Sequence, residues 1–185
     1  MSSAGRWEHA VLALLDDLEL QAEGLHLAER AAEVDALTVA EYAEVPLVAR
    51  LHASIGRQVR VGVTDDLDVR GRLARVGSDW MLVDQGHIAW FVHLSATLVV
   101  SGLGQHSVPD EARPLSARLS LRSVLRRLAE ERRDCALHLS GGRVVLGSLL
   151  RVGADFVELR SPDVPDPVVV PLSAVAVVRD SAGPA

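Results

Sequence analysis

The stretch Gly71-Arg72-Leu73-Ala74-Arg75-Val76-Gly77-Ser78-Asp79-Trp80 returns later in the chain as Gly147-Ser148-Leu149-Leu150-Arg151-Val152-Gly153-Ala154-Asp155-Phe156. Six of the nine positions from Gly71 to Asp79 are identical at an offset of 76, and the tenth position is aromatic both times. The similarity extends outward to 61–64 with 137–140, and to 94–96 with 172–174. A match of this length indicates two copies of one small domain rather than the short units of a solenoid.

Each copy has the pattern of five short strands. In the first copy, apolar residues alternate with polar or small ones at 59–63, 69–73 and 88–94, as expected for strands with one buried face. Gly71 and Gly147 fall inside the second strand of each copy. A glycine within a strand marks a sharp bend or the close approach of another backbone. We therefore interpret both glycines as structural positions of a strongly bent sheet.

The repeat resembles the Sm-like (LSm) fold, in which a short helix precedes five curved strands and the second strand carries Gly-x-Leu-x-x-apolar. This signature matches 71–76 and 147–152, and the resemblance covers 47–101 and 120–179. The whole chain is also similar to an actinobacterial family with an acidic amphipathic N-terminus and two such barrels. The fold class implied is mainly β with helical additions, as two tandem Sm-like five-stranded barrels. The resemblance implies no activity, because the usual RNA-contacting motifs are missing from both copies.

Four segments follow from this pattern. They are an acidic amphipathic helical segment at 1–46, a first barrel at 47–103, a linker at 104–114, and a second barrel at 115–180 with a leading Arg-rich helix. Sm-like barrels have free edges on their fourth and fifth strands, and an exposed edge invites pairing. We expect the fourth strand of one copy, 88–94 or 168–172, to pair with the fifth strand of the other. Neither 97–100 nor 175–178 contains a charge or a proline that would blunt the remaining edges.

The N-terminal segment combines an apolar seam with acidic flanks. Trp7, Val11, Leu14 and Leu18 follow a 4-3-4 spacing, which is the a/d pattern of a coiled coil or a helical hairpin. Residues 1–50 hold ten acidic residues and only three arginines. The seam either packs on the chain's own barrels or forms a dimer interface, and both interpretations stay open.

The opposite charge is concentrated before the second barrel, where residues 113–128 hold five arginines and no acidic residue. Leucines predict an apolar helix side from Leu115 to Leu128. The other side presents Arg118, Arg122, Arg126 and Arg127. This arginine face is a solvated surface, a docking face for the acidic N-terminal helix of the same or a neighbouring chain, or a phosphate-binding strip. Opposite charges on a partner helix would mainly fix its orientation.

The chain lacks a recognisable catalytic or metal-binding constellation. None of its seven histidines is spaced as a metal ligand beside a cysteine or a carboxylate cluster, so we expect no metal and no cofactor. The single cysteine, Cys135, alternates with leucines as a buried thiol would. Asp79 and Asp155 recur in both copies, and we interpret them as caps that bond the backbone N–H groups of their own turns. No nucleophile elbow, phosphate loop or dinucleotide fingerprint is present, so we expect no enzyme.

These patterns predict a cytoplasmic, non-catalytic binding or scaffold module. We expect it to self-associate as a homodimer or larger assembly through its N-terminal helix or its barrel edges, with an unidentified protein as a further partner. The alternative is an RNA-binding or transcription-associated regulator that uses the arginine strip of 113–133, although the net charge of −6 disfavours it. The longest apolar runs are far shorter than the ~20 residues of a membrane-spanning helix, and from the residues at its start we expect no signal peptide.

Overall fold

The computed structural model describes residues 42–64 and 67–180. The chain divides into two compact units between residues 45 and 46, and the second unit holds both repeats. The predicted N-terminal seam, formed by Trp7, Val11, Leu14 and Leu18, lies outside the described residues.

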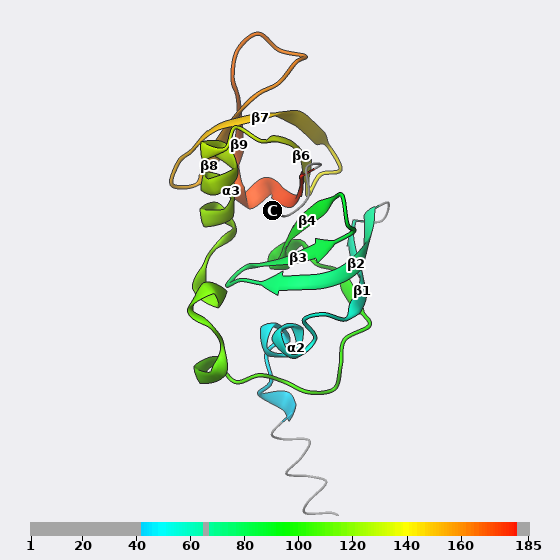
Figure 1. Cartoon of the computed structure of the whole chain (residues 1–185). Coiled ribbons are helices and arrows are strands. Elements are labelled where there is room, and N and C mark those ends of the chain that lie inside the picture. Colours follow the sequence, from blue (N-terminus) through cyan, green and yellow to red (C-terminus); the bar gives the residue numbers. More distant parts are fainter. Residues whose placement is uncertain (1–41, 65–66, 181–185) are drawn as a thin grey trace, which may run out of the picture. The chain divides into compact units, whose positions relative to one another are not determined.

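Each repeat contributes one helix and then five strands in the same order (Figure 1). The first repeat consists of α2 (Leu47–Ala53), β1 (Gln58–Thr64), β2 (Leu67–Val76), β3 (Trp80–Asp84), β4 (Ala89–His93) and β5 (Val99–Ser101). The second consists of α3 (Leu121–Glu130), β6 (Asp134–Leu139), β7 (Val144–Val152), β8 (Phe156–Arg160), β9 (Val168–Pro171) and β10 (Val175–Asp180). Short 3-10 turns, Leu94–Ala96 and Leu172–Ala174, precede the fifth strands, and two others, Asp110–Ala112 and Leu115–Arg118, lie between the repeats.

The ten strands form one antiparallel sheet in the order β5-β1-β2-β3-β4-β10-β6-β7-β8-β9. The prediction of a mainly β fold is thereby confirmed. The sheet is not closed into a barrel. The reason lies at the middle of the sheet, where β4 pairs with β10 of the other repeat instead of returning to its own fifth strand. Consequently β5 and β9 each have one neighbour within 42–64 and 67–180, and they form the two outer edges of this sheet.

The junction between the repeats is the antiparallel pairing of β4 with β10. Phe91 lies opposite Val178, and Val92 lies opposite Val177. This confirms the expectation that the fourth strand of one copy joins the fifth strand of the other. Because β10 also pairs with β6, the ladder of backbone hydrogen bonds continues from one repeat into the next. Val92 and Val177 are both fully buried there.

Two apolar clusters form the core. One surrounds α2 and the inner face of the first repeat, with Leu51, Val61 and Leu73 fully buried. The other combines α3 with the second repeat, and it also takes in Trp80, Leu82, Ala89 and Phe91 of the first repeat. Strand β3 is therefore buried on both faces, since Met81 and Val83 belong to the first cluster. Each large apolar side chain that is fully buried contributes about 1.5–3 kcal/mol.

Helix α3 is amphipathic and shorter than predicted. Leu121, Leu125 and Leu128 follow helical spacing and are buried in the second cluster. Leu115 and Leu119, which were expected on the same side, are exposed. The helix begins only after Ser120, because the carbonyl of Leu119 accepts the backbone N–H of Ser78 at 3.1 Å instead of a helical N–H.

Gly71 and Gly147 lie where the second strand of each repeat passes close to the backbone of the third. A Cβ at Gly71 would lie 2.5 Å from the carbonyl oxygen of Asp84 and 2.9 Å from Cγ1 of Val83. A Cβ at Gly147 would lie 2.9 Å from the carbonyl carbon of Arg160, and closer still to that residue's carbonyl oxygen. Both positions require glycine, because the group that a side chain would meet is backbone.

Candidate functional site: the cleft between the repeats

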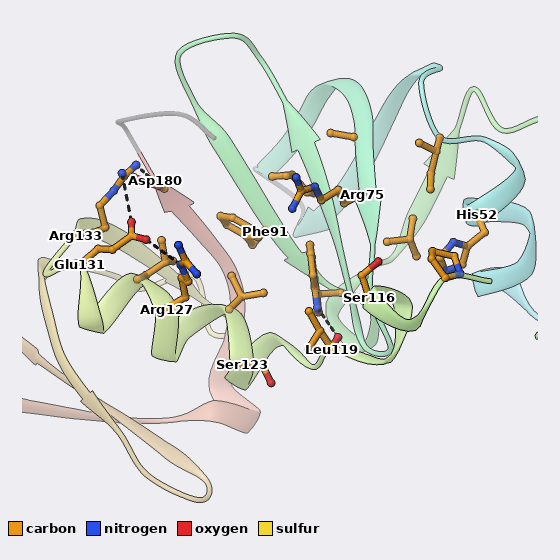
Figure 2. A pocket seen from close by; sticks show the side chains of 18 residues that line it. His52, Arg75, Phe91, Ser116, Leu119, Ser123, Arg127, Glu131, Arg133 and Asp180 are labelled. Atoms are coloured by element: carbon orange, nitrogen blue, oxygen red, sulfur yellow. Dashed lines mark hydrogen bonds and ion pairs between the residues drawn. The ribbon is translucent and has the colours of Figure 1, made fainter. Parts of the chain in front are cut away.

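An open cleft of about 880 Å³ lies between the outer face of the first repeat and helix α3 (Figure 2). Trp80, Leu82 and Phe91 line it from the first repeat, and Val124 and Leu128 line it from α3. The opposite walls belong to different repeats, so the cleft exists only because the two copies are joined. Its volume falls in the range of roughly 300–1,000 Å³ that is usual for ligand-binding sites.

The floor of the cleft is aromatic. The rings of Trp80 and Phe91 have centroids 5.6 Å apart and planes inclined by 56°, a tilted arrangement that aromatic pairs favour. The indole Nε1 of Trp80 donates a hydrogen bond to the backbone oxygen of Leu119 at 2.8 Å. This bond satisfies the polar edge of the indole. Gly77 permits the arrangement, because a Cβ there would overlap the same indole ring.

Asp79 fixes the helix that forms the opposite wall. Its Oδ1 accepts the backbone N–H of Leu121, the first residue of α3, at 2.7 Å. The first N–H groups of a helix lack intrahelical partners, so an acceptor at this place stabilises the helix. Ser120, the N-cap residue itself, makes no side-chain capping bond. Asp79 thus caps a helix 42 residues away in the chain, which differs from the predicted bond to its own turn.

The equivalent loop of the second repeat makes a different contact. The backbone carbonyls of Asp79 and Asp155 accept the N–H groups of Leu94 and Leu172, each at 2.8 Å. Asp155 is exposed, and none of the residues that the structure describes donates a hydrogen bond to its carboxylate. The two turns therefore make the same backbone hydrogen bond, but within the described part of the chain only the side chain of Asp79 accepts a hydrogen bond from a helix.

Arginines dominate the rim of the cleft. Arg127 Nε donates to Glu131 Oε1 at 3.0 Å, and Arg133 Nη2 donates to Asp180 Oδ2 at 2.7 Å. Arg75, on β2, also lines the cleft, and its side chain is exposed (Figure 2). Within 42–64 and 67–180, no hydrogen bond or ion pair reaches its guanidinium. The rim therefore combines two neutralised arginines with one whose charge is not compensated.

The predicted arginine face is interrupted in the structure. Arg127 lines the cleft, and Arg122 Nη1 donates to the backbone oxygen of Ala154 at 3.2 Å. Arg118, in the 3-10 turn before α3, and Arg126, on α3, are exposed. No hydrogen bond or ion pair joins either guanidinium to the described part of the chain. Arg118 and Arg126 are therefore the two members of the predicted face that make no hydrogen bond or ion pair within the described residues.

Trp90, His138 and Arg179 form a cluster at the junction of β4, β10 and β6. The rings of Trp90 and His138 have centroids 5.7 Å apart, and the guanidinium carbon of Arg179 lies 5.8 Å from the centroid of the Trp90 ring. Burial, and then the charge of Arg179, lower the pKa of His138. Burial also lowers the pKa of His52 at the edge of the cleft. Both imidazoles are therefore favoured in their neutral forms.

The described residues hold no group of three or more His, Cys, Asp or Glu side chains that could bind a metal ion. Cys135 is buried, and its burial, together with the charge of Asp180, raises the pKa of its thiol to about 12. A thiol with so high a pKa is protonated and a poor nucleophile at neutral pH. In the same part of the chain, no helix combines the length and the apolar character needed to cross a membrane.

Comparison with known proteins does not assign this cleft. No family model matches the chain, and no curated protein matches it.

The cleft was not predicted from the sequence, although a signal for it exists. Strand β3 carries an unbroken apolar run, Trp80-Met81-Leu82-Val83, and such a run is typical of a strand that is buried on both faces. The outer face of this strand therefore had to be covered by another element. Of the predicted partner-binding arginines, only Arg127 lines the cleft.

Proposed function

We propose that this protein is a non-catalytic, cytoplasmic binding or scaffold module that self-associates. In this proposal the cleft of one copy receives the acidic amphipathic N-terminal segment of another copy. The observation that carries the proposal is the cleft itself, with an aromatic and aliphatic floor and an uncompensated Arg75 on its rim. A concave apolar surface with a few well-placed polar groups is the usual form of a binding site.

Each repeat is proposed to be a divergent Sm-like unit. This assignment is supported by the motif Gly-x-Leu-x-x-apolar in β2 and β7, and by the packing of each leading helix on that same strand. It is also supported by the sheet order, in which the fifth strand of each repeat lies beside the first. A pair of such units offers binding surfaces, and function has to be argued from those surfaces rather than from the fold.

The apolar part of the cleft favours a partner with an apolar stripe. Ile55 and Leu119 line its walls and remain 45% and 50% exposed. Covering exposed apolar surface stabilises a complex by about 25 cal/mol for each Å² removed from water, before the costs of association. The spacing of Trp7, Val11 and Leu14 would place such a stripe along one side of a helix.

The charges of the cleft favour an acidic partner. Arg127 and Arg133 already have carboxylate partners, so Arg75 is the position where an additional carboxylate gains most. Residues 1–50 carry ten acidic residues and three arginines, which makes the N-terminal segment of a second copy complementary to this rim. Such complementarity fixes the orientation and speeds the encounter more than it raises affinity.

The proposal is tested by the mass of the full chain in solution. The variants are Arg75→Glu at the rim of the cleft and Leu14→Asp in the seam. Arg70→Glu is the matched control, because Arg70 is an exposed arginine of the same strand that does not line the cleft. Light scattering at micromolar concentration should give the wild type and the control a mass of at least twice the 19.8 kDa of one chain.

Each single variant should move toward the mass of one chain. A mixture of the two should recover part of the association, because a mixed pair retains one intact cleft and one intact seam. Recovery on mixing would assign the two defects to opposite sides of one interface. A wild-type mass of 19.8 kDa, or an Arg75→Glu variant as associated as the control, would contradict the proposal.

The alternative proposal, an RNA-binding or transcription-associated regulator, is favoured by one observation. Arg118 and Arg126 are exposed and uncompensated within the described residues, and free arginines bind phosphate well. Under this alternative the purified protein retains nucleic acid at low salt, and the replacement of both arginines by glutamate lowers the retention. Binding that arises from phosphate contacts also weakens steeply as salt is raised. An absorbance ratio of pure protein at low salt would exclude this role.

A further inference from the structure

The two outer strands of the sheet, β5 and β9, differ from their counterparts β10 and β4, which pair with each other at its centre. Strand β9 is the counterpart of β4, because Leu172 corresponds to Leu94 at an offset of 78. Strand β4 pairs with β10, whereas among the described residues β9 has no neighbour other than β8. The same offset makes Pro171 the counterpart of His93, and Pro167 the counterpart of Ala89.

The direction of the backbone groups in β4 follows from one hydrogen bond. The N–H of Leu94 donates to the carbonyl of Asp79 at 2.8 Å, on the side of β3. Backbone groups alternate between the two neighbours along an antiparallel strand. Residues 89, 91 and 93 therefore turn their N–H groups toward β10. The register agrees, since Ala89 lies opposite Asp180 and Phe91 lies opposite Val178.

The backbone groups of β9 alternate in the same way as those of β4. Most of the N–H groups that would face the open edge are missing, however. The N–H of Leu172 donates to the carbonyl of Asp155 at 2.8 Å, on the side of β8. By the same alternation, residues 169 and 171 face the open edge, as does residue 167, which directly precedes the strand. Two of these three are proline, which has no backbone N–H. Only Val169 can donate a hydrogen bond to a further strand.

We infer that Pro167 and Pro171 close the outer edge of β9 to a further strand, so that the second repeat ends the sheet. Val169 is 57% exposed at this edge, and an exposed apolar strand edge otherwise invites pairing with another chain. Proline on an edge strand is a recognised way to prevent such pairing. The inference does not depend on the proposed function, because neither proline lines the cleft.

The opposite edge of the sheet is closed by different means. Strand β5 spans only Val99–Ser101, whereas its counterpart β10 spans Val175–Asp180. The chain turns away at Gly102, which has a φ of 91°, and the carbonyl of Gly102 accepts a hydrogen bond from Arg57 Nε at 3.1 Å. Little of this edge remains for pairing.

The inference is tested by restoring the residues of the first repeat at the two prolines, as Pro167→Ala with Pro171→His. The backbone accepts the change, since Pro171 has φ −59° and ψ 135° and His93 has φ −72° and ψ 129°. The probe is a fluorescent synthetic peptide of residues 174–180, which contains the residues 177–180 that pair with β4. Pro162→Ala with Pro165→Ala is the control, because these prolines precede β9 and lie outside its edge.

Fluorescence anisotropy should show saturable peptide binding to the edge variant, about tenfold tighter or more than to the wild type or the control, because two hydrogen bonds are regained. Hydrogen exchange of the Val169 amide should slow only in the edge variant with peptide. The inference is overturned if the wild type binds the peptide as tightly as the variant. It is also overturned if the folded variant binds no more tightly than the control.

Discussion

Replacing Gly71 or Gly147 by alanine should destabilise the protein through a collision with backbone. At Gly71 the new Cβ would stand 2.5 Å from the carbonyl oxygen of Asp84 and 2.9 Å from Cγ1 of Val83. At Gly147 the nearest atoms belong to the carbonyl of Arg160. Real Cβ atoms essentially never approach another heavy atom within 3.0 Å, so the second and third strands would have to separate.

The size of the effect is set by two opposing terms. Overpacking that forces a backbone shift costs about 1–3 kcal/mol. Alanine also reduces the conformational freedom of the unfolded chain, which restores about 0.4–1 kcal/mol. We therefore expect each variant to lose roughly 1–2 kcal/mol of unfolding free energy, and valine at either position to lose more.

Urea denaturation followed by far-ultraviolet circular dichroism measures this loss. The control is Gly141→Ala, since a Cβ at Gly141 would meet no atom within 4 Å and the backbone there needs no positive φ. The control should unfold within about 0.5 kcal/mol of the wild type. If Gly71→Ala and Gly147→Ala both unfold at the same urea concentration as the control, the close approach of the second and third strands is wrong.

Three further predictions concern single side chains. Asp79→Ala should lose about 0.5–2 kcal/mol with the cap of α3, whereas Asp155→Ala should stay near the wild type; equal losses in thermal melts would contradict the assignment. Burial lowers the pKa of His138 below its ordinary value of 6.5, so the unfolded chain binds a proton first and stability falls as the pH drops through 6.5. His138→Gln should flatten this fall in melting temperature between about pH 7 and pH 5.5, and an unchanged slope would refute it. Because burial raises the pKa of Cys135 to about 12, iodoacetamide at neutral pH should label this thiol only after unfolding, and fast labelling of the folded chain would count against its burial.

The repeat made the strand content and the central junction predictable. Alternation of apolar residues is a local property, so the strands around Val61 and Val92 could be placed from the sequence alone. That a fourth strand would pair with the fifth strand of the other copy was predictable for a different reason, because two copies of one unit carry complementary edges. Which of the two fourth strands would do so was left open, and the structure shows that it is β4. Both features follow from the pattern of apolar residues within each copy and from the presence of two copies.

The features that were not predicted depend on contacts between residues far apart in the chain. Leu115 and Leu119 fit the helical pattern, but hydrogen bonds from Ser78 and Trp80 to the carbonyl of Leu119 delay the start of α3. The cap of α3 comes from Asp79, which no spacing rule connects to a helix 42 residues away. The arginine face was divided partly for the same reason, because Arg122 donates to the backbone oxygen of Ala154, 32 residues further along the chain.

The open edge of the second repeat is β9 and not the predicted 175–178. Strand β10, which contains 175–178, pairs with β4 on one side and with β6 on the other. Two prolines occupy the edge that is open. Which strand is central and which is terminal depends on the order in which the repeats join, and a repeat pattern does not encode that order.

The differences between the repeats determine how copies of this chain can associate. A duplicated unit whose edges all remained open would pair head to tail without limit and form a ring or a filament. Here Ala89 and His93 of the pairing strand are replaced by Pro167 and Pro171 of the outer strand, and the other outer strand is cut to three residues. Association through the cleft, by contrast, can close on itself in a pair. The weight-average mass should therefore rise to a plateau with increasing concentration. A mass that continues to rise would mean that a sheet edge is open, and it would contradict the closure of both edges even if the cleft variants behaved as expected.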